Sequence, residues 1–446
     1  MTEGNCMKLI VQFFLPILAG NFFQQFYNFI DSVIVGKGIG DAALAAVGNT
    51  GSVHFFILGF MIGLTGGLGI YISQSFGAQD YGKMRQETAM SVLICLGIGV
   101  VVTILSLLAM RPLFTFLNTP QDMMKDTISY FRIILIGSTV TVCNNFAMTL
   151  LRCVGNSRVP LIAMILSSII NVILDVLFVF PGKMGVSGAA LATVLAQVIV
   201  TMIMLFGVIL QKKENVLKGL RLFVKIPLEY VQGICKIGIP TALQGMVYCF
   251  ISMVLTRMVA GFGPEAIATQ RVGGQIESIS WNTADGFGAA MNAFIGQNYG
   301  AGKTERVKKG YRASLCTVGI WGILITLVFV VVPVPIASVF FHEKTAIATA
   351  VDYLIIVGYG EAFLCVELMT VGALSGLGRT RLCSVISIVF TSLRIPLAII
   401  LSSGVLGILG IWWALTTTTM MKGIIFTCAF FIIMRKMTDA QRTDII

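Results

Sequence analysis

Charged side chains are scarce in this sequence. Only 11% of its 446 residues are Asp, Glu, Lys or Arg, and 30 phenylalanines outnumber the 20 acidic residues. Soluble domains carry about 25% charged residues, and a soluble chain of this length would need roughly three such domains. The few charges present cannot cover those surfaces. The composition therefore excludes a soluble enzyme, a nucleic-acid-binding protein and a secreted module.

Histidine, paired cysteine and a leader cleavage site are also lacking. Two histidines, His54 and His342, cannot supply the paired axial ligands of a multi-haem membrane enzyme. The ten cysteines contain no CxxC pair, so we interpret them as packing residues rather than metal ligands or disulfides. The amino terminus has no small-residue cleavage site, and we expect the first apolar run to remain as a membrane span.

Long apolar runs occupy most of the chain, and its mean hydropathy is +0.91. A membrane-spanning helix needs about 20 apolar residues. We therefore predict an all-α polytopic membrane protein. Several of its spans exceed the minimum length, which permits tilt or a kink near Pro16, Pro240 and Pro396. The twelve predicted transmembrane helices are 11–35, 44–73, 88–110, 128–151, 159–180, 185–210, 230–260, 267–296, 311–340, 350–376, 382–402 and 405–434.

Basic residues gather in the even-numbered loops between these spans and in the tail. Cytoplasmic loops of membrane proteins carry an excess of Lys and Arg, so both termini are predicted to be cytoplasmic and the chain to lie in the cytoplasmic (inner) membrane. The net charge of +11 thus reflects orientation in a lipid bilayer and not a nucleic-acid partner. The odd-numbered loops hold few basic residues beyond Lys37, Arg111, Lys125, Lys183 and Lys344.

The sequence repeats itself after 223 residues, which is half its length. Gln74–Ala78 (QSFGA) recurs as Gln297–Ala301 (QNYGA), and Leu151–Arg158 recurs as Leu374–Arg381. Six spans in each half give both halves the same orientation, which is a parallel repeat around a central cavity. This is the architecture of a transporter whose halves rock against each other. The predicted domains are an amino-terminal lobe (1–210), a cytoplasmic linker (211–227) and a carboxyl-terminal lobe (228–446).

One segment imitates a phosphate-binding loop. Gly296–Thr304 ends in Gly-Lys-Thr, but five residues separate Gly296 from Gly302 where the Walker pattern needs four. No strand precedes the segment, and its repeat copy ends a predicted membrane helix. We therefore expect no ATP binding, and predict that an ion gradient drives transport.

Three polar side chains of the amino-terminal half stand inside predicted spans. Asp31 lies deep in the first span, and Asn171 and Asp175 lie four residues apart on one face of the fifth. A carboxylate in the bilayer core costs about 2.5–3.5 kcal/mol, so such a group is a functional candidate. The three residues predict a site for a cation or a proton. Oxygen ligands suit Na⁺ as a metal, but the same groups can bind H⁺, and the residues leave this choice open.

The carboxyl-terminal half does not duplicate this site. Adding 223 places Arg394 at the position of Asn171 and Ala398 at that of Asp175. Glu277 and Glu367 are instead our candidates for binding a cationic substrate or a second proton. Other charges of this half are interpreted as buried ion pairs (Glu361, Arg394 and Arg257) or as structural or snorkelling residues (Arg271 and Lys422).

Together these motifs resemble the multidrug and toxic compound extrusion (MATE) family over nearly the whole chain. The matching segments include Tyr27–Asp31, Leu44–Gly48, Gln74–Ala78, Asn171–Asp175 and Gly185–Ala190. The resemblance implies two six-helix lobes that export cationic or amphipathic small molecules, such as drugs, in exchange for Na⁺ or H⁺ by alternating access. It implies no enzymatic activity and no cofactor other than the coupling ion, and we expect a monomer.

The resemblance also assigns residues. Asp31, Asn171 and Asp175, with Thr193 in the sixth span, match the cation site of family members that bind the ion in the amino-terminal lobe. Gln24, Tyr27 and Asn145 match supporting residues of the cavity. Gln244 stands where another branch of the family carries an acid.

Three other classes of protein remain as alternatives. A flippase for lipid-linked sugars, from the same wider superfamily, would use intramembrane arginines such as Arg257, Arg271 and Arg394. A membrane enzyme would need a His, Asp and Cys constellation at the membrane surface, which the sequence does not contain. A passive channel would need a selectivity-filter motif, and none is present.

Overall fold

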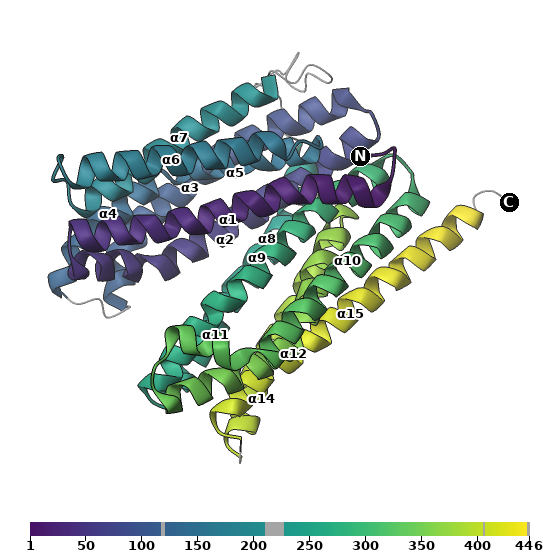
Figure 1. Ribbon diagram of the computed structural model, residues 1–446. Coiled ribbons are helices and arrows are strands. Elements are labelled where there is room, and N and C mark those ends of the chain that lie inside the picture. The colour runs from purple at the N-terminus through teal and green to yellow at the C-terminus, as the bar shows by residue number, and fades with distance from the viewer. Residues whose placement is uncertain (117–120, 210–226, 405, 444–446) are drawn as a thin grey trace. The chain divides into compact units, whose positions relative to one another are not determined.

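The described part of the computed structural model comprises residues 1–116, 121–209, 227–404 and 406–443, and all of its regular elements are helices (Figure 1). The helices are α1 Cys6–Gly38, α2 Asp41–Gly77, α3 Tyr81–Phe116, α4 Gln121–Ile136, α5 Ser138–Cys153, α6 Arg158–Val179, α7 Val186–Ile209, α8 Leu228–Ala260, α9 Pro264–Gly300, α10 Thr304–Val331, α11 Pro333–Phe340, α12 Lys344–Gly376, α13 Thr380–Ser392, α14 Arg394–Ser402 and α15 Ile408–Thr443.

Ten helical segments of the described chain are long and apolar enough to cross a membrane, and the pair α4–α5, bent by 47°, makes an eleventh. The sequence predicts twelve. The remaining one coincides with α9, whose 37 residues are long enough but include charged residues such as Glu265, Arg271 and Glu277. The all-helical membrane fold is therefore confirmed, although polar and charged residues keep α9 out of the group of ten apolar helices.

Prolines explain two breaks inside predicted spans. The ninth predicted span divides into α10 and α11, and Pro333 opens α11 at a position where its missing N–H costs no hydrogen bond. The eleventh divides into α13 and α14 near Pro396, whose missing N–H cannot bond to the carbonyl of Ser392, the last residue of α13. By contrast, α1 and α8 continue through Pro16 and Pro240.

The chain forms two compact units. The amino unit is Leu15–Ala242, and the carboxyl unit is Met1–Phe14 together with Leu243–Ile446. The change of unit falls within α1, next to Pro16, and within α8, next to Pro240. The predicted linker lies outside the described residues up to residue 226, so the lobe boundaries drawn from the sequence stay predictions.

The backbone repeats with the same period as the sequence. Helix α2 begins at Asp41 and α9 at Pro264, which is 223 residues later. The residue before each is a glycine at positive φ, Gly40 at 119° and Gly263 at 104°, a conformation that glycine adopts without a steric penalty. The turns after α5 and α12 repeat in the same way, at Gly155 (83°) and Gly378 (76°).

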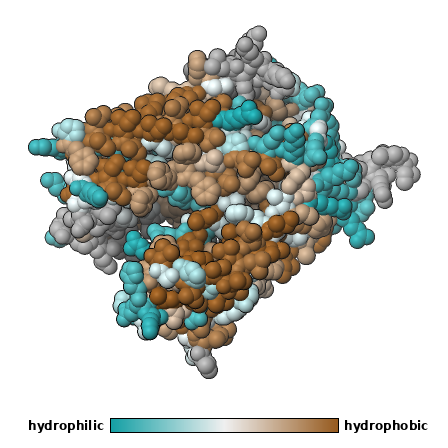
Figure 2. Space-filling view, viewed as in Figure 1, coloured by the Kyte–Doolittle hydropathy of each residue, from teal (hydrophilic) through white to brown (hydrophobic). Residues whose placement is uncertain are grey.

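Apolar side chains cover the outside of the helices. On the visible face, hydrophobic residues gather over the middle stretches of the helices and hydrophilic residues at their ends (Figure 2). Leu108 on α3 is 74% exposed and Ile320 on α10 is 69% exposed. Such a belt of exposed apolar surface is expected where a helical bundle faces lipid.

Within the carboxyl unit, α9 and α12 pack through glycines. A Cβ atom added to Gly372 would collide with the carbonyl of Gly288, and one added to Gly376 would lie 2.7 Å from the carbonyl oxygen of Asn292. Small residues let two membrane helices approach this closely. The close packing positions the acidic residues that α9 and α12 carry.

We therefore expect Gly372→Ala to lower the stability of the protein by about 1–3 kcal/mol, because the two helices must separate to admit the methyl group. Unfolding in detergent micelles would measure the change. The matched control is Gly274→Ala on α9, where an added Cβ meets no atom within 4 Å. Equal stabilities of the two variants would contradict this account of the packing.

Candidate functional site

The amino unit gathers polar side chains from three helices. Asp31 lies on α1, Asn171 and Asp175 lie one turn apart on α6, and Thr193 lies on α7. Helices α6 and α7 run side by side (Figure 1). Asn171 and Asp175 are 2% and 0% exposed, whereas Asp31 and Thr193 are half-buried. The structure thus brings together the four residues predicted for the cation or proton site.

Asn171 connects the other members of this group. The amide nitrogen of Asn171 is turned toward Asp175, and Asn171 Nδ2 donates to Asp175 Oδ2 at 2.7 Å. Asn171 Oδ1 accepts a hydrogen bond from the Thr193 backbone N–H at 3.2 Å. This orientation is assigned from the hydrogen bonds it satisfies. The amide therefore holds the Asp175 carboxyl in place and ties α6 to α7.

The two carboxyl groups face each other. Asp31 and Asp175 lie within hydrogen-bonding reach, on different helices. Each keeps one buried oxygen, Oδ1, that has no hydrogen-bond partner among the described residues. Two negative charges at such a distance repel strongly, so the pair requires a shared proton or a bound cation. The oxygens without partners are positioned to receive it.

Two tyrosines complete the cluster. The Thr193 hydroxyl donates to the carbonyl of Ala189 at 3.0 Å, and the Tyr27 hydroxyl lies within hydrogen-bonding reach of Thr193. Tyr130 on α4 lies within electrostatic range of Asp31, Asp175 and Tyr27. Sequence reasoning placed Tyr27 in the cavity but missed Tyr130. The repeat carried the missing signal, because adding 223 to 130 gives another tyrosine, Tyr353.

The other predicted cavity residues of this half lie apart from the cluster. Gln24 is exposed on α1, about two turns before Asp31, and Asn145 is half-buried on α5. Within the described residues, neither makes a hydrogen bond to the cluster.

In the carboxyl unit, the buried acid Glu367 has a partner of its own, whereas both oxygens of the buried Glu361 lack a hydrogen-bond partner among the described residues. The Lys422 ammonium donates to Glu367 Oε1 at 2.8 Å, and both side chains are less than 10% exposed. Snorkelling is therefore wrong for Lys422, whereas its structural alternative agrees with this ion pair. Arg394 donates to the hydroxyls of Thr418 and Thr419 at 3.1 Å each. Fixed cations thus lie beside the acids of this unit. Gln244 is half-buried on α8.

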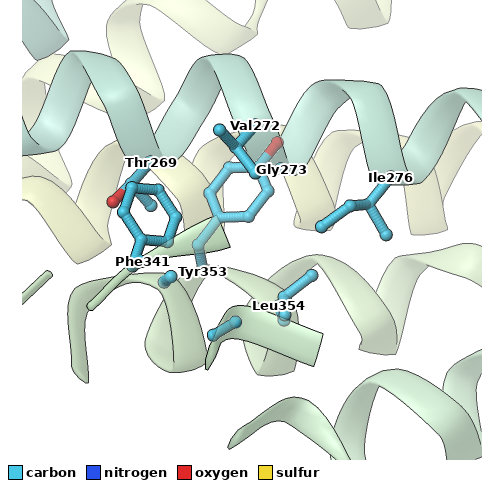
Figure 3. Close-up of a pocket in the computed structure, with 9 residues that line it drawn as sticks. Thr269, Val272, Gly273, Ile276, Phe341, Tyr353 and Leu354 are labelled. Carbon is cyan, nitrogen blue, oxygen red and sulfur yellow. The ribbon is translucent and has the colours of Figure 1, made fainter. Parts of the chain in front are cut away.

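Glu277 is bound through a tyrosine. The Tyr353 hydroxyl donates to Glu277 Oε2 at 3.0 Å. Figure 3 shows the Tyr353 ring lying against α9, beside Gly273, where a Cβ atom would collide with the ring. The adjacent cavity has a volume of only about 10 Å³, which is too small for an organic substrate. Glu361 is 1% exposed and lies within electrostatic range of Glu277.

A repeated helical membrane fold that carries a facing carboxyl pair, with no fixed counter-charge among the described residues, defines a membrane transporter. The sequence profile of the MatE family matches residues 16–177 and 240–400, one segment in each half, and together they cover more than two thirds of the chain. The chain therefore belongs to the MATE family of multidrug efflux transporters and is not an enzyme.

Curated relatives resemble the chain along most of its length. A probable multidrug resistance protein of Bacillus subtilis, YpnP, is 28% identical over 90% of this chain and 90% of its own. A probable multidrug resistance protein of Thermotoga maritima, NorM, is 26% identical over 91% of this chain and 88% of its own. The multidrug export protein MepA of Staphylococcus aureus is 22% identical over 93% of this chain and 91% of its own.

Solved structures share the fold. A MATE crystal structure in a bent conformation superimposes with a TM-score of 0.90 at 23% identity, covering 98% of this chain and 97% of the other. An outward-facing multidrug resistance MATE transporter superimposes with a TM-score of 0.88 at 23% identity, with the same coverage.

Proposed function

We propose that the protein is a secondary antiporter that exports cationic or amphipathic small molecules in exchange for Na⁺ or H⁺. The observation that carries this proposal is the facing pair of Asp31 and Asp175, each with a buried oxygen that lacks a hydrogen-bond partner among the described residues. Family membership supports ion-coupled antiport in general. The printed names of the relatives, multidrug resistance and export proteins, support drug-like substrates.

The donor set fits either coupling ion. Carboxylate, amide and hydroxyl oxygens are the hard ligands that an alkali cation requires, and Asp31, Asn171, Asp175 and Thr193 offer all three kinds. A proton would be shared between the two carboxyl groups. In both cases the positive charge removes the repulsion between α1 and α6, and its release restores that repulsion. This change in the packing of α1 is the step that couples ion binding to alternating access.

The cluster also offers an attractive surface for a cationic substrate. Tyr27 and Tyr130 place aromatic rings beside the two carboxyl groups, and aromatic faces attract organic cations. A bound organic cation and the coupling ion would therefore compete for the same negative charge, which is what exchange requires. Gln24, Asn145, Gln244, Glu277 and Glu367 remain proposed contributors to substrate binding.

The proposed arrangement in the membrane follows the basic loops. Two lobes, 1–210 and 228–446, are joined by the linker 211–227, and both termini lie in the cytoplasm of the cell, beneath the inner membrane. The flippase alternative relies on intramembrane arginines. One of the three, Arg394, is buried and hydrogen-bonded to threonines, which weakens that alternative.

The test is efflux of a cationic dye from proteoliposomes in which Na⁺ and proton gradients are imposed separately. We expect one of the two gradients to drive efflux above the rate in protein-free liposomes, and an ionophore that collapses that gradient to stop it. The responding gradient identifies the coupling ion. If neither gradient drives efflux, the antiporter mechanism is wrong.

A further inference from the structure

A cavity of about 280 Å³ opens between α10 and α15 in the carboxyl unit, away from the acidic clusters. Lys308 and Arg312 of α10 line it together with Arg435 of α15. Helix α10 begins at Thr304 and α15 ends at Thr443, so the cavity lies near the ends of both helices. Helix ends of a membrane protein stand at the level of the lipid headgroups. The position of the cavity is therefore one that a phospholipid headgroup can reach.

The charges around the cavity favour an anion. Its three cations outnumber its one carboxylate, Asp439. Lys308 Nζ lies 3.0 Å from Glu305 Oε1, but the Glu305 side chain is 72% exposed, and such surface pairs hold weakly. Arg312 and Arg435 are both exposed. A guanidinium group offers paired N–H donors that match the oxygens of a phosphate.

The other side of the cavity is apolar. Phe430 and Met434 line it and are 1% and 2% exposed, and Phe431 beside them is 40% exposed. The Phe430 ring stacks on Tyr311 of α10 with a centroid distance of 3.6 Å, which holds the two helices together at this point. A free inorganic anion gains nothing from this surface. A ligand with both a phosphate and a hydrocarbon chain uses both sides.

The internal repeat shows that the fold itself does not require this site. Subtracting 223 places Ala89, which is 1% exposed, at the position of Arg312, and Gly207 at that of Phe430. A Cβ atom at Gly207 would collide with Val159 of α6, so the corresponding place in the amino unit is already filled. Arg312 and the two aromatic rings are thus a property of one half alone, whereas Lys308 and Arg435 correspond to the basic residues Arg85 and Lys212.

We propose that this cavity binds an anionic phospholipid, with Arg312 and Arg435 on the phosphate and Phe431 along the first part of an acyl chain. Basic pockets between membrane helices are suited to such headgroups. The choice of leaflet, the cytoplasmic one, rests on the orientation given under the proposed function. The existence of the site does not depend on that orientation.

Native mass spectrometry of the full-length protein, exchanged into detergent with phosphatidylglycerol or phosphatidylcholine, tests the proposal. We expect the unmodified protein to retain phosphatidylglycerol about tenfold more strongly than phosphatidylcholine, since each arginine contributes attraction for an anionic lipid. The double variant Arg312→Gln with Arg435→Gln should lose this preference. The matched control, Lys309→Gln with Lys436→Gln, removes the same charge from neighbouring positions of the same helices that do not line the cavity, and should keep it.

Three results would overturn the proposal: equal retention of both lipids by the unmodified protein, unchanged preference in the arginine double variant, or the same loss in the lysine control. A further experiment adds glycerol phosphate to the protein that has bound phosphatidylglycerol. If it displaces phosphatidylglycerol at equal concentration, the site binds a free phosphate and not a lipid. Should the double variant not fold, Arg435→Gln alone is expected to weaken the preference for phosphatidylglycerol over phosphatidylcholine. Because retention is measured without transport, its failure would not affect the proposed antiport.

Discussion

Asp31→Asn and Asp175→Asn are each expected to reduce gradient-driven efflux to the rate seen in protein-free liposomes. An amide keeps the shape of the carboxyl group but neither takes up a proton nor carries the charge that holds a cation. The cycle of repulsion and neutralisation between α1 and α6 then stops. Proteoliposome efflux of a cationic dye, under whichever gradient drives the unmodified protein, measures the loss.

Stability separates this loss of function from a folding defect. Neutralising one of two facing buried carboxyl groups removes repulsion, so we expect both variants to unfold at the same or a higher temperature than the unmodified protein. The matched control is Asp126→Asn, which makes the same change on an exposed position of α4 in the same unit and should leave efflux intact. Efflux that persists in both Asp31→Asn and Asp175→Asn would refute the site.

The second large effect concerns the carboxyl unit. Lys422→Met is expected to cost about 3–5 kcal/mol of stability, because it leaves the Glu367 carboxylate buried without its counter-charge. Unfolding in mixed micelles, monitored by tryptophan fluorescence, measures the cost. A cost of this size requires a charged Glu367 in the folded protein.

A second variant tests that requirement. Lys422→Met combined with Glu367→Gln removes both charges, and should recover most of the lost stability. If the double variant is as unstable as the sum of the two single variants, the ion pair does not account for the effect. A stable Lys422→Met variant would show that Glu367 is neutral in the folded protein, which would favour our first interpretation of Glu367 as a proton-binding group.

Much of the fold follows from local composition. Apolar runs of about 20 residues predicted each span, because only structures that satisfy their own backbone hydrogen bonds, such as helices, are stable in the bilayer core. The span 267–296 was predicted in the same way, although α9 is not among the helices that pass as apolar spans. The helix starts follow the repeat as well, at Asp41 and Pro264, because homologous halves keep the same turns.

Tertiary packing decided how residues at equivalent positions of the two repeats differ in structure. Gly137 and Gly360 are equivalent in the repeat, yet the chain bends by 47° between α4 and α5 at Gly137, whereas α12 continues through Gly360. An added Cβ would lie 2.5 Å from Val194 at Gly137 but 3.3 Å from Thr416 at Gly360. Neighbouring helices on each side, and not the glycine, therefore determine the local geometry.

Because charged residues are scarce, the few acids inside the spans are candidates for function. With so few acids in the spans, Asp31 and Asp175 stood out from the sequence alone, because a charge in lipid is costly and is retained only for a purpose. Asn171 stood out because it shares a helix face with Asp175. The sequence could not show that Asn171 joins Asp175 to Thr193, that Tyr130 lies beside the pair, or that Lys422 neutralises Glu367. Those relations join residues as far as 99 positions apart, and only the packing of helices against one another brings such residues within hydrogen-bonding or electrostatic range.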